Sequence, residues 1–203
     1  YASATSGLRL TLAVTTPPAH AQTCPDTNAK PNLTSQTRWP RSAHLNYFID
    51  DRIPQPQRDQ IVSAMTLWNT ENTRNGSGVI FTQVYSILES NTPVHLTFTN
   101  EIPPGGWGSY GNCVVARVDR LATDVNGSLS AASVSFNING VCRPSAGVIY
   151  PEYDPNAPGY DTFFKKISLH EVGHTLGLDH PSSPKAGFSI MNGSDPGELA
   201  PND

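Results

Sequence analysis

The chain has 203 residues, 15% of them charged, and a formal net charge of −4. This weak and mixed charge gives no support for binding to nucleic acid or to an anionic membrane surface. No stretch approaches the roughly 20 consecutive apolar residues of a membrane-spanning helix. The length suits a single domain with a substantial core.

The first part of the chain, residues 1–38, is rich in Thr, Pro, Asn and Ala and has no hydrophobic periodicity, which predicts a leader and linker. An apolar run at 8–14 and the Ala-His-Ala step at 19–21 resemble the tail of a secretory signal, although a disordered leader is the alternative. Because the chain begins with Tyr1 instead of Met, we expect it to be a fragment or a trimmed chain. We expect a secreted protein whose ordered domain spans 39–203.

The first predicted elements are a strand and a helix. Segment 44–50 alternates apolar residues on one face, which indicates a strand. Segment 54–72 begins with prolines and then keeps the i, i+3, i+4, i+7 spacing of a helix face, through Ile61, Ala64, Met65 and Trp68. The turn sequence Asn-Gly-Ser-Gly at 75–78 is expected to end this helix.

Four more strands and a second helix are predicted further along. The strands are expected at 79–85, 94–100, 113–119 and 132–138, the last two joined by a turn containing Asp-Val-Asn-Gly-Ser. After a long Gly/Pro loop from 139 to 159, Asp161 can cap a helix that turns Phe163, Phe164, Ile167 and Val172 toward the core. This order predicts an α+β domain with a twisted mixed sheet of about five strands, an early helix and a late helix.

The three cysteines, Cys24, Cys113 and Cys142, contain no Cys-x-x-Cys pair, which argues against a cysteine-type zinc site. Cys113 and Cys142 could form a disulfide in an exported protein, and Cys24 would then stay unpaired.

The strongest chemical signal is "HEVGHTLGLDH" at residues 170–180. On a helix, His170 and His174 project from the same face, and Glu171 can point at a metal-bound water. Gly177 can end the helix in a left-handed conformation and let the chain bring His180 back. Three neutral imidazoles and one open position are typical of a catalytic zinc site, in which the ion activates the bound water and Glu171 accepts its proton.

The extended pattern fixes five positions, so a chance match is expected on the order of once in several million start positions. The alternative, a helix with ordinary histidines, is correspondingly weak. At these residues the sequence resembles the metzincin zinc metallopeptidases, which also carry a methionine after the third histidine. Met191 stands in that place, and in the family it lies beneath the zinc and supports the ligands without binding.

Within the metzincins, the motif "HEVGHTLGLDHP" and the opening "RWPRSAHLNYFIDDRIP" are similar to the matrixins, the matrix-metalloprotease-like branch. Pro181 stands where animal matrixins usually have serine, so a divergent or non-animal member is expected. Asn192 follows Met191 in place of tyrosine, so the tyrosine zinc ligand of astacins and serralysins is absent. The resemblance implies a terminal helix that "GELAPND" would begin, and we expect that helix to be missing. A propeptide-like thiolate role for Cys24 is an alternative to a linker cysteine.

Further metal sites are weakly indicated. A structural zinc would need more histidines than His95, which is expected on an exposed strand face, so we predict none. Calcium is an additional expectation without assigned residues, because the candidates Asp124, Asn126 and Asp154 are better explained as turn residues.

The sequence therefore predicts a zinc endopeptidase in which His170, His174 and His180 bind one zinc ion and Glu171 is the general base. Its expected partner is a protein or peptide substrate, paired with the strand at 113–119, and the chain is expected to be a monomer. Two alternatives are a secreted, non-catalytic binding module that keeps zinc for structure, and a metzincin peptidase of another branch.

Overall fold

The computed structural model describes residues 38–86, 93–102, 115–138, 159–180 and 190–191. In chain order the elements are β1 (His44–Ile49), α1 (Gln55–Arg74), β2 (Ile80–Val84), β3 (Leu96–Thr99), β4 (Ala116–Thr123), β5 (Leu129–Phe136) and α2 (Tyr160–Thr175). The protein is an α+β protein, as predicted. None of the helices in the described ranges is both long and apolar enough to cross a membrane.

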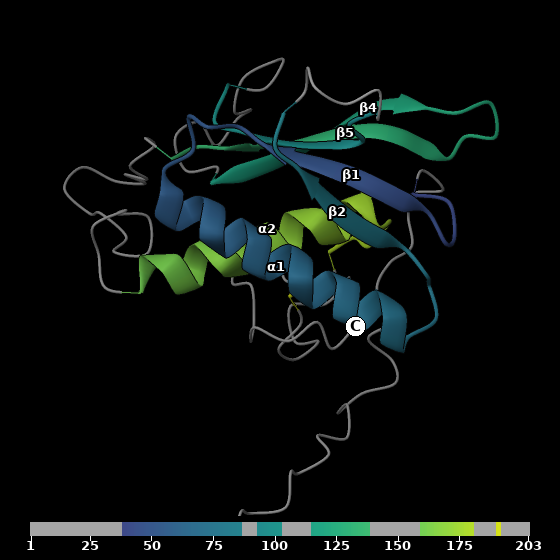
Figure 1. The fold of residues 1–203 in the computed structure, drawn as a ribbon, viewed down its shortest axis with the longest axis horizontal. Coiled ribbons are helices and arrows are strands. Elements are labelled where there is room, and N and C mark those ends of the chain that lie inside the picture. The colour runs from purple at the N-terminus through teal and green to yellow at the C-terminus, as the bar shows by residue number, and fades with distance from the viewer. Residues whose placement is uncertain (1–37, 87–92, 103–114, 139–158, 181–189, 192–203) are drawn as a thin grey trace, which may run out of the picture.

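The five strands form one mixed sheet in the order β2-β1-β3-β5-β4. The neighbours from β2 to β5 pair in parallel, whereas β4 runs antiparallel to β5. Both helices lie on the same face of the sheet and pack against each other there (Figure 1). This arrangement places α2, which carries the histidine motif, between α1 and the β4–β5 end of the sheet.

The core forms between this sheet face and the two helices because each element has one apolar side. In β1, the alternating residues Leu45, Tyr47 and Ile49 are all buried, as the period of two predicts. In α1, the predicted face is buried as well; it comprises Ile61, Ala64, Met65 and Trp68. The sequence pattern therefore predicted correctly which sides of β1 and α1 meet the core, whereas Phe163, predicted to face the core on α2, is only partly buried.

The edge strand β2 is held by α1 through the side chain of Asn69. Its amide nitrogen donates to the Phe81 carbonyl at 2.8 Å, and its amide oxygen accepts from the Phe81 N–H at 2.8 Å. One side chain thus satisfies both backbone groups of Phe81, which a neighbouring strand would otherwise bond.

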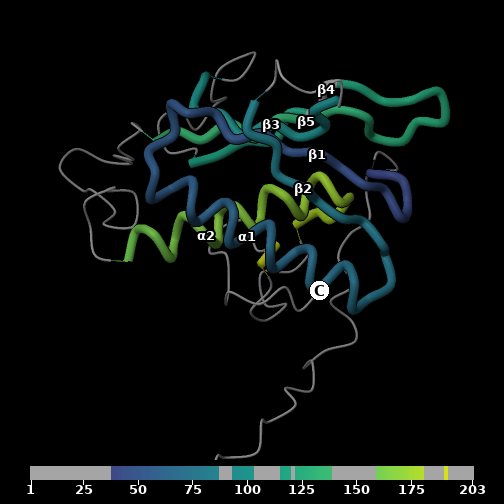
Figure 2. Tube along the Cα trace, viewed as in Figure 1, coloured from purple at the N-terminus to yellow at the C-terminus, as the bar shows by residue number. Residues whose placement is uncertain are grey.

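The β4–β5 hairpin reaches beyond the rest of the sheet (Figure 2). Its strands lie closer to the turn than the predicted ranges 113–119 and 132–138, because the turn is short. The Asp124 carboxylate accepts from the N–H groups of Asn126 and Ser128 at 2.8 and 2.9 Å. Asp124 is thus a turn residue, which was the simpler of the two predictions for it.

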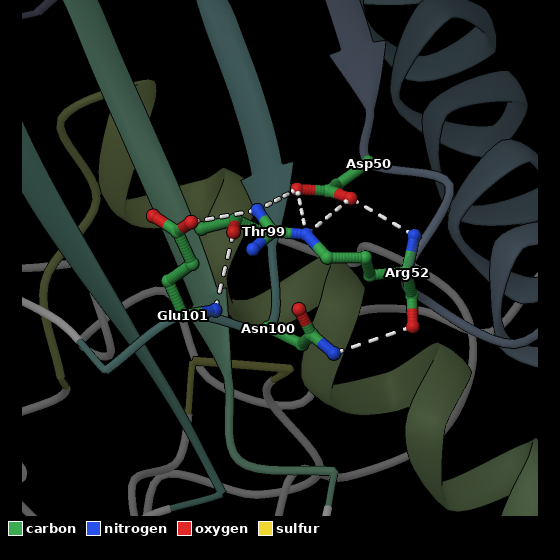
Figure 3. A network of polar contacts seen from close by, with 5 residues as sticks. All are labelled: Asp50, Arg52, Thr99, Asn100 and Glu101. Carbon is green, nitrogen blue, oxygen red and sulfur yellow. Dashed lines mark hydrogen bonds and ion pairs between the residues drawn. The ribbon is translucent and has the colours of Figure 1, made fainter.

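The carboxyl ends of β1 and β3 are joined by a polar network around Arg52 (Figure 3). The Arg52 guanidinium contacts the Asp50 carboxylate and, at 2.7 Å, the Glu101 carboxylate. Asn100 donates to the Arg52 carbonyl at 3.2 Å. The hydrogen bonds from Arg52 lower the pKa of Asp50.

One predicted cap is wrong. The helix α2 begins at Tyr160 after Gly159, whose φ of 91° is left-handed, and no side chain caps this end. Asp161 lies in the first turn instead of at the cap, because the glycine already supplies the turn that starts the helix. Several expectations fall outside the described residues: those on the leader, the three cysteines, Asp154 and the terminal helix.

Candidate metal centre

The motif lies on the most buried helix of the described chain. The apolar residues of α2 that face the core include Phe164, Leu169 and Val172, each fully buried. Because this packing fixes the orientation of the helix, His170 and His174 emerge one turn apart on the same side. His170 itself is 6% exposed, so its ring is held within the protein.

The end of α2 returns the chain toward these two histidines. Gly177 has a φ of 92°. The Leu178 N–H donates to the Gly173 carbonyl at 3.1 Å, and the Gly177 N–H donates to the His174 carbonyl at 3.2 Å. These two bonds form a Schellman motif, which needs a left-handed residue at the position of Gly177. The sharp turn brings His180 against the helix it has just left.

The three imidazoles meet at their Nε2 atoms. The Nε2 atom of His170 lies 3.0 Å from that of His180 and 3.1 Å from that of His174. Two ligands of a tetrahedral zinc ion, each 2.0–2.1 Å from the metal, are roughly 3.3 Å apart. The predicted ligands therefore come together as a group that could hold one metal ion, and the spacing and donor type fit zinc.

Two of the rings are oriented by backbone carbonyls. His170 Nδ1 lies 2.8 Å from the Ile190 carbonyl oxygen, and His174 Nδ1 lies 2.9 Å from that of Leu178. A carbonyl can only accept, so each Nδ1 carries the proton and each Nε2 keeps its lone pair. This is the arrangement by which proteins prepare a neutral imidazole for a metal.

Electrostatics favour the same neutral form of His170. Burial first, and then the neighbouring His174, lower the pKa of His170 to about 3. The ring is thus uncharged at neutral pH, which is the state that binds a cation.

Glu171, the predicted general base, is buried beside the first ligand and is 7% exposed. Burial raises the pKa of Glu171 to about 8 in the metal-free chain. A carboxyl group whose ionisation is disfavoured by burial, next to a candidate metal ligand, is typical of functional sites.

Met191 is fully buried and packs on α2 at Gly173. A Cβ atom at position 173 would lie 2.4 Å from the Met191 Sδ and 3.4 Å from the Trp68 ring. The glycine therefore leaves the space that Met191 occupies. Met191 directly follows Ile190, whose carbonyl oxygen lies 2.8 Å from His170 Nδ1.

The sequence patterns did not predict the roles of three further residues, His95, Trp39 and Trp68. His95, expected on an exposed strand face, is half-buried just before β3, where its Nδ1 accepts from the Asn46 N–H at 3.0 Å. Its ring also contacts Trp39 edge to face. The two tryptophans Trp39 and Trp68 donate indole N–H bonds to α2, which no spacing rule predicts.

Two solved structures of myroilysin resemble the chain at low similarity. The first is 20% identical over 72% of this chain and 48% of that chain, with a TM-score of 0.38. The second is 19% identical over 71% and 45%, with a TM-score of 0.37. The chain thus spans about half the length of these structures. No protein-family model and no curated protein matches the sequence.

Proposed function

We propose that the protein is a secreted, zinc-dependent endopeptidase of the matrixin-like branch of the metzincins. The observation that carries the proposal is the meeting of the three Nε2 atoms of His170, His174 and His180 beside the buried Glu171. This set provides three ligands, one acid–base group and no fourth protein ligand among the described residues, as a catalytic zinc site requires.

Each residue would have one role. His170, His174 and His180 would hold the ion, with the first two kept in the binding tautomer by the Ile190 and Leu178 carbonyls. A zinc ion bound there would supply Lewis acidity, which lowers the pKa of water and polarises the substrate carbonyl. Glu171 would take the proton from the attacking water and deliver it to the leaving amine.

The sheet supports a peptide as the substrate. β4 stands at the end of the strand order, and it contacts α2. An extended peptide can add to such an edge through main-chain hydrogen bonds, next to the metal-bearing helix. We therefore propose an unfolded or extended segment of a protein as substrate, and a monomeric enzyme, because one chain provides the complete ligand set.

The test combines metal analysis with hydrolysis of an unfolded protein. We expect one zinc per chain and chelator-sensitive cleavage. The Glu171→Gln variant should keep its zinc and lose at least about 100-fold in kcat/KM. As a matched control, Glu71→Gln changes a partly buried glutamate of α1 that pairs with the exposed Arg74, and it should cleave like the wild type.

Two outcomes would count against the proposal. A Glu171→Gln protein as active as the wild type would refute the role of the carboxylate. Zinc held by a fourth protein ligand, in a chain that cleaves nothing, would support the non-catalytic binding module.

A further inference from the structure

Two buried tryptophans bind the ligand-bearing stretch of α2 from outside the helix. The Trp68 indole N–H, from α1, donates to the Leu169 carbonyl at 3.0 Å. The Trp39 indole N–H, from the segment before β1, donates to the Thr175 hydroxyl at 3.1 Å. Leu169 directly precedes His170, and Thr175 directly follows His174. The two bonds therefore bracket the part of the helix that carries the first two candidate ligands.

Both contacts are fully shielded from water. Trp39, Trp68, Leu169 and Thr175 are each at most 3% exposed. The Thr175 hydroxyl also donates to the Val172 carbonyl at 2.8 Å, so a chain of two hydrogen bonds connects the Trp39 indole to the helix backbone. Buried hydrogen bonds of this kind are costly to break, because the donor would have no replacement partner.

The Trp68 bond has a direct geometric consequence for His170. The Leu169 carbonyl belongs to the same planar peptide unit as the His170 N–H. Fixing that carbonyl therefore fixes the peptide plane from which the His170 side chain extends. On this turn, a Cβ atom at Gly173 would lie 2.4 Å from the Met191 sulfur and 3.4 Å from the Trp68 ring, so Met191 and Trp68 leave no room for the helix to shift toward them.

We propose that Trp39 and Trp68 are positioning residues of the three-histidine site, whose indole N–H groups set the angle at which His170 and His174 meet a metal ion. The inference rests on the proposed function for the metal site alone, and it needs no peptide hydrolysis. In this view the tryptophans act through the helix, without touching metal or substrate.

The test uses Co²⁺ as a probe in place of zinc, because its visible absorption reports the ligand geometry. Trp68→Phe removes the bond to Leu169 and Trp39→Phe the bond to Thr175, whereas Thr175→Val removes the Trp39 bond together with the hydroxyl bond to Val172. We expect Co²⁺ affinity to fall by about 3- to 10-fold, the effect of one buried hydrogen bond, and the absorption bands to shift. Thr175→Ser keeps the hydroxyl and should restore both properties.

A matched control distinguishes the positioning role from a general contribution to stability. Asn69→Ala removes two part-buried hydrogen bonds made by the residue next to Trp68, but those bonds go to β2 instead of α2. It should lower the unfolding midpoint and leave the Co²⁺ spectrum unchanged. Thr175→Val is nearly isosteric, so it tests the proposal even when a tryptophan variant does not fold.

Each result has a defined meaning. Wild-type Co²⁺ spectra and affinity in all three variants, with only the unfolding midpoint lowered, would overturn the positioning role. A wild-type chain that binds Co²⁺ but cleaves no peptide overturns the proposed function and leaves this inference standing if the variants shift the spectrum. A wild-type chain that takes up no Co²⁺ overturns both.

Discussion

Gly173 is a residue of the helix α2 against which Met191 packs closely. Any side chain at this position must displace the sulfur, since the added Cβ would lie 2.4 Å from it. Alanine is also the better helix former, by about 1 kcal/mol, so a loss of stability on substitution could not come from helix propensity.

We therefore predict that Gly173→Ala lowers the free energy of unfolding by about 1–3 kcal/mol, the usual cost of overpacking. Zinc affinity should fall as well, because Ile190 would move with Met191. Denaturant unfolding and a zinc competition titration measure the two effects. The double variant Gly173→Ala with Met191→Ala should lose less than the sum of the single changes. Strict additivity would show that the two side chains do not compete for this space.

The raised pKa of Glu171 predicts that the stability of the metal-free protein depends on pH. Burial raises its pKa from 4.5 to about 8, so the native state keeps a proton that the unfolded chain has lost between these values. This contribution to stability is complete below pH 4.5 and is lost as the pH rises through 8. His170 acts in the opposite direction, since its pKa falls from 6.5 to about 3, and its contribution is lost as the pH falls from 6.5 toward 3.

Between pH 4.5 and 6.5 the contributions of Glu171 and His170 to the pH dependence of stability oppose each other. Above pH 6.5, of these two groups, only Glu171 still contributes. In chelator-treated protein, the free energy of unfolding should fall by roughly 1 kcal/mol per pH unit between 6.5 and 8. Glu171→Gln cannot ionise and should not show this decline. Parallel curves for the two proteins over that range would contradict the assignment.

The sequence predicted the candidate ligands themselves but not what orients them. Spacing on a helix and a glycine after it were enough to bring His170, His174 and His180 together. The Ile190 carbonyl that orients His170 left no signal, because every residue type carries the same backbone group. The bonds from Trp39 and Trp68 also join residues far apart in the chain, beyond the reach of local patterns.

At the scale of elements, prediction succeeded where one face is buried and the other is not. The strand at 44–50 and the helix at 54–72 were predicted within a few residues, since their apolar residues keep a strict period. The β4 strand was placed too early, because it is an edge strand with charged residues and irregular pairing near Arg120 and Ala122.

The link between α1 and the edge strand β2 gives a prediction at this scale. Asn69→Ala should leave the Phe81 N–H and carbonyl without their partners and lower the free energy of unfolding by about 1–3 kcal/mol. Asn69→Asp keeps an acceptor for the N–H but cannot donate to the carbonyl. Equilibrium unfolding in denaturant should therefore rank the aspartate variant between the wild type and the alanine variant. An alanine variant as stable as the wild type would show that water replaces the side chain.

For the whole molecule, zinc should act as a stabilising ligand, because the three candidate ligands meet only in the folded chain. Free zinc at 1,000 times its dissociation constant would add about 4 kcal/mol, which corresponds to a rise in Tm on the order of 10 °C. Calorimetry with chelator and then with zinc measures this shift. In His174→Ala, which lacks one ligand, Tm should respond far less, and an equal response would place the zinc elsewhere.

Two bonds made by residues late in the chain also determine when the site can exist during folding. Trp39 and Thr175 are 136 residues apart, and the carbonyl that orients His170 comes 20 residues after it. Closing such long loops is slow, and during synthesis it must wait until the later residue has left the ribosome. The proposed peptidase would have no oriented metal ligands while its own chain is still unfolded, which is when that chain would be the easiest substrate to cleave.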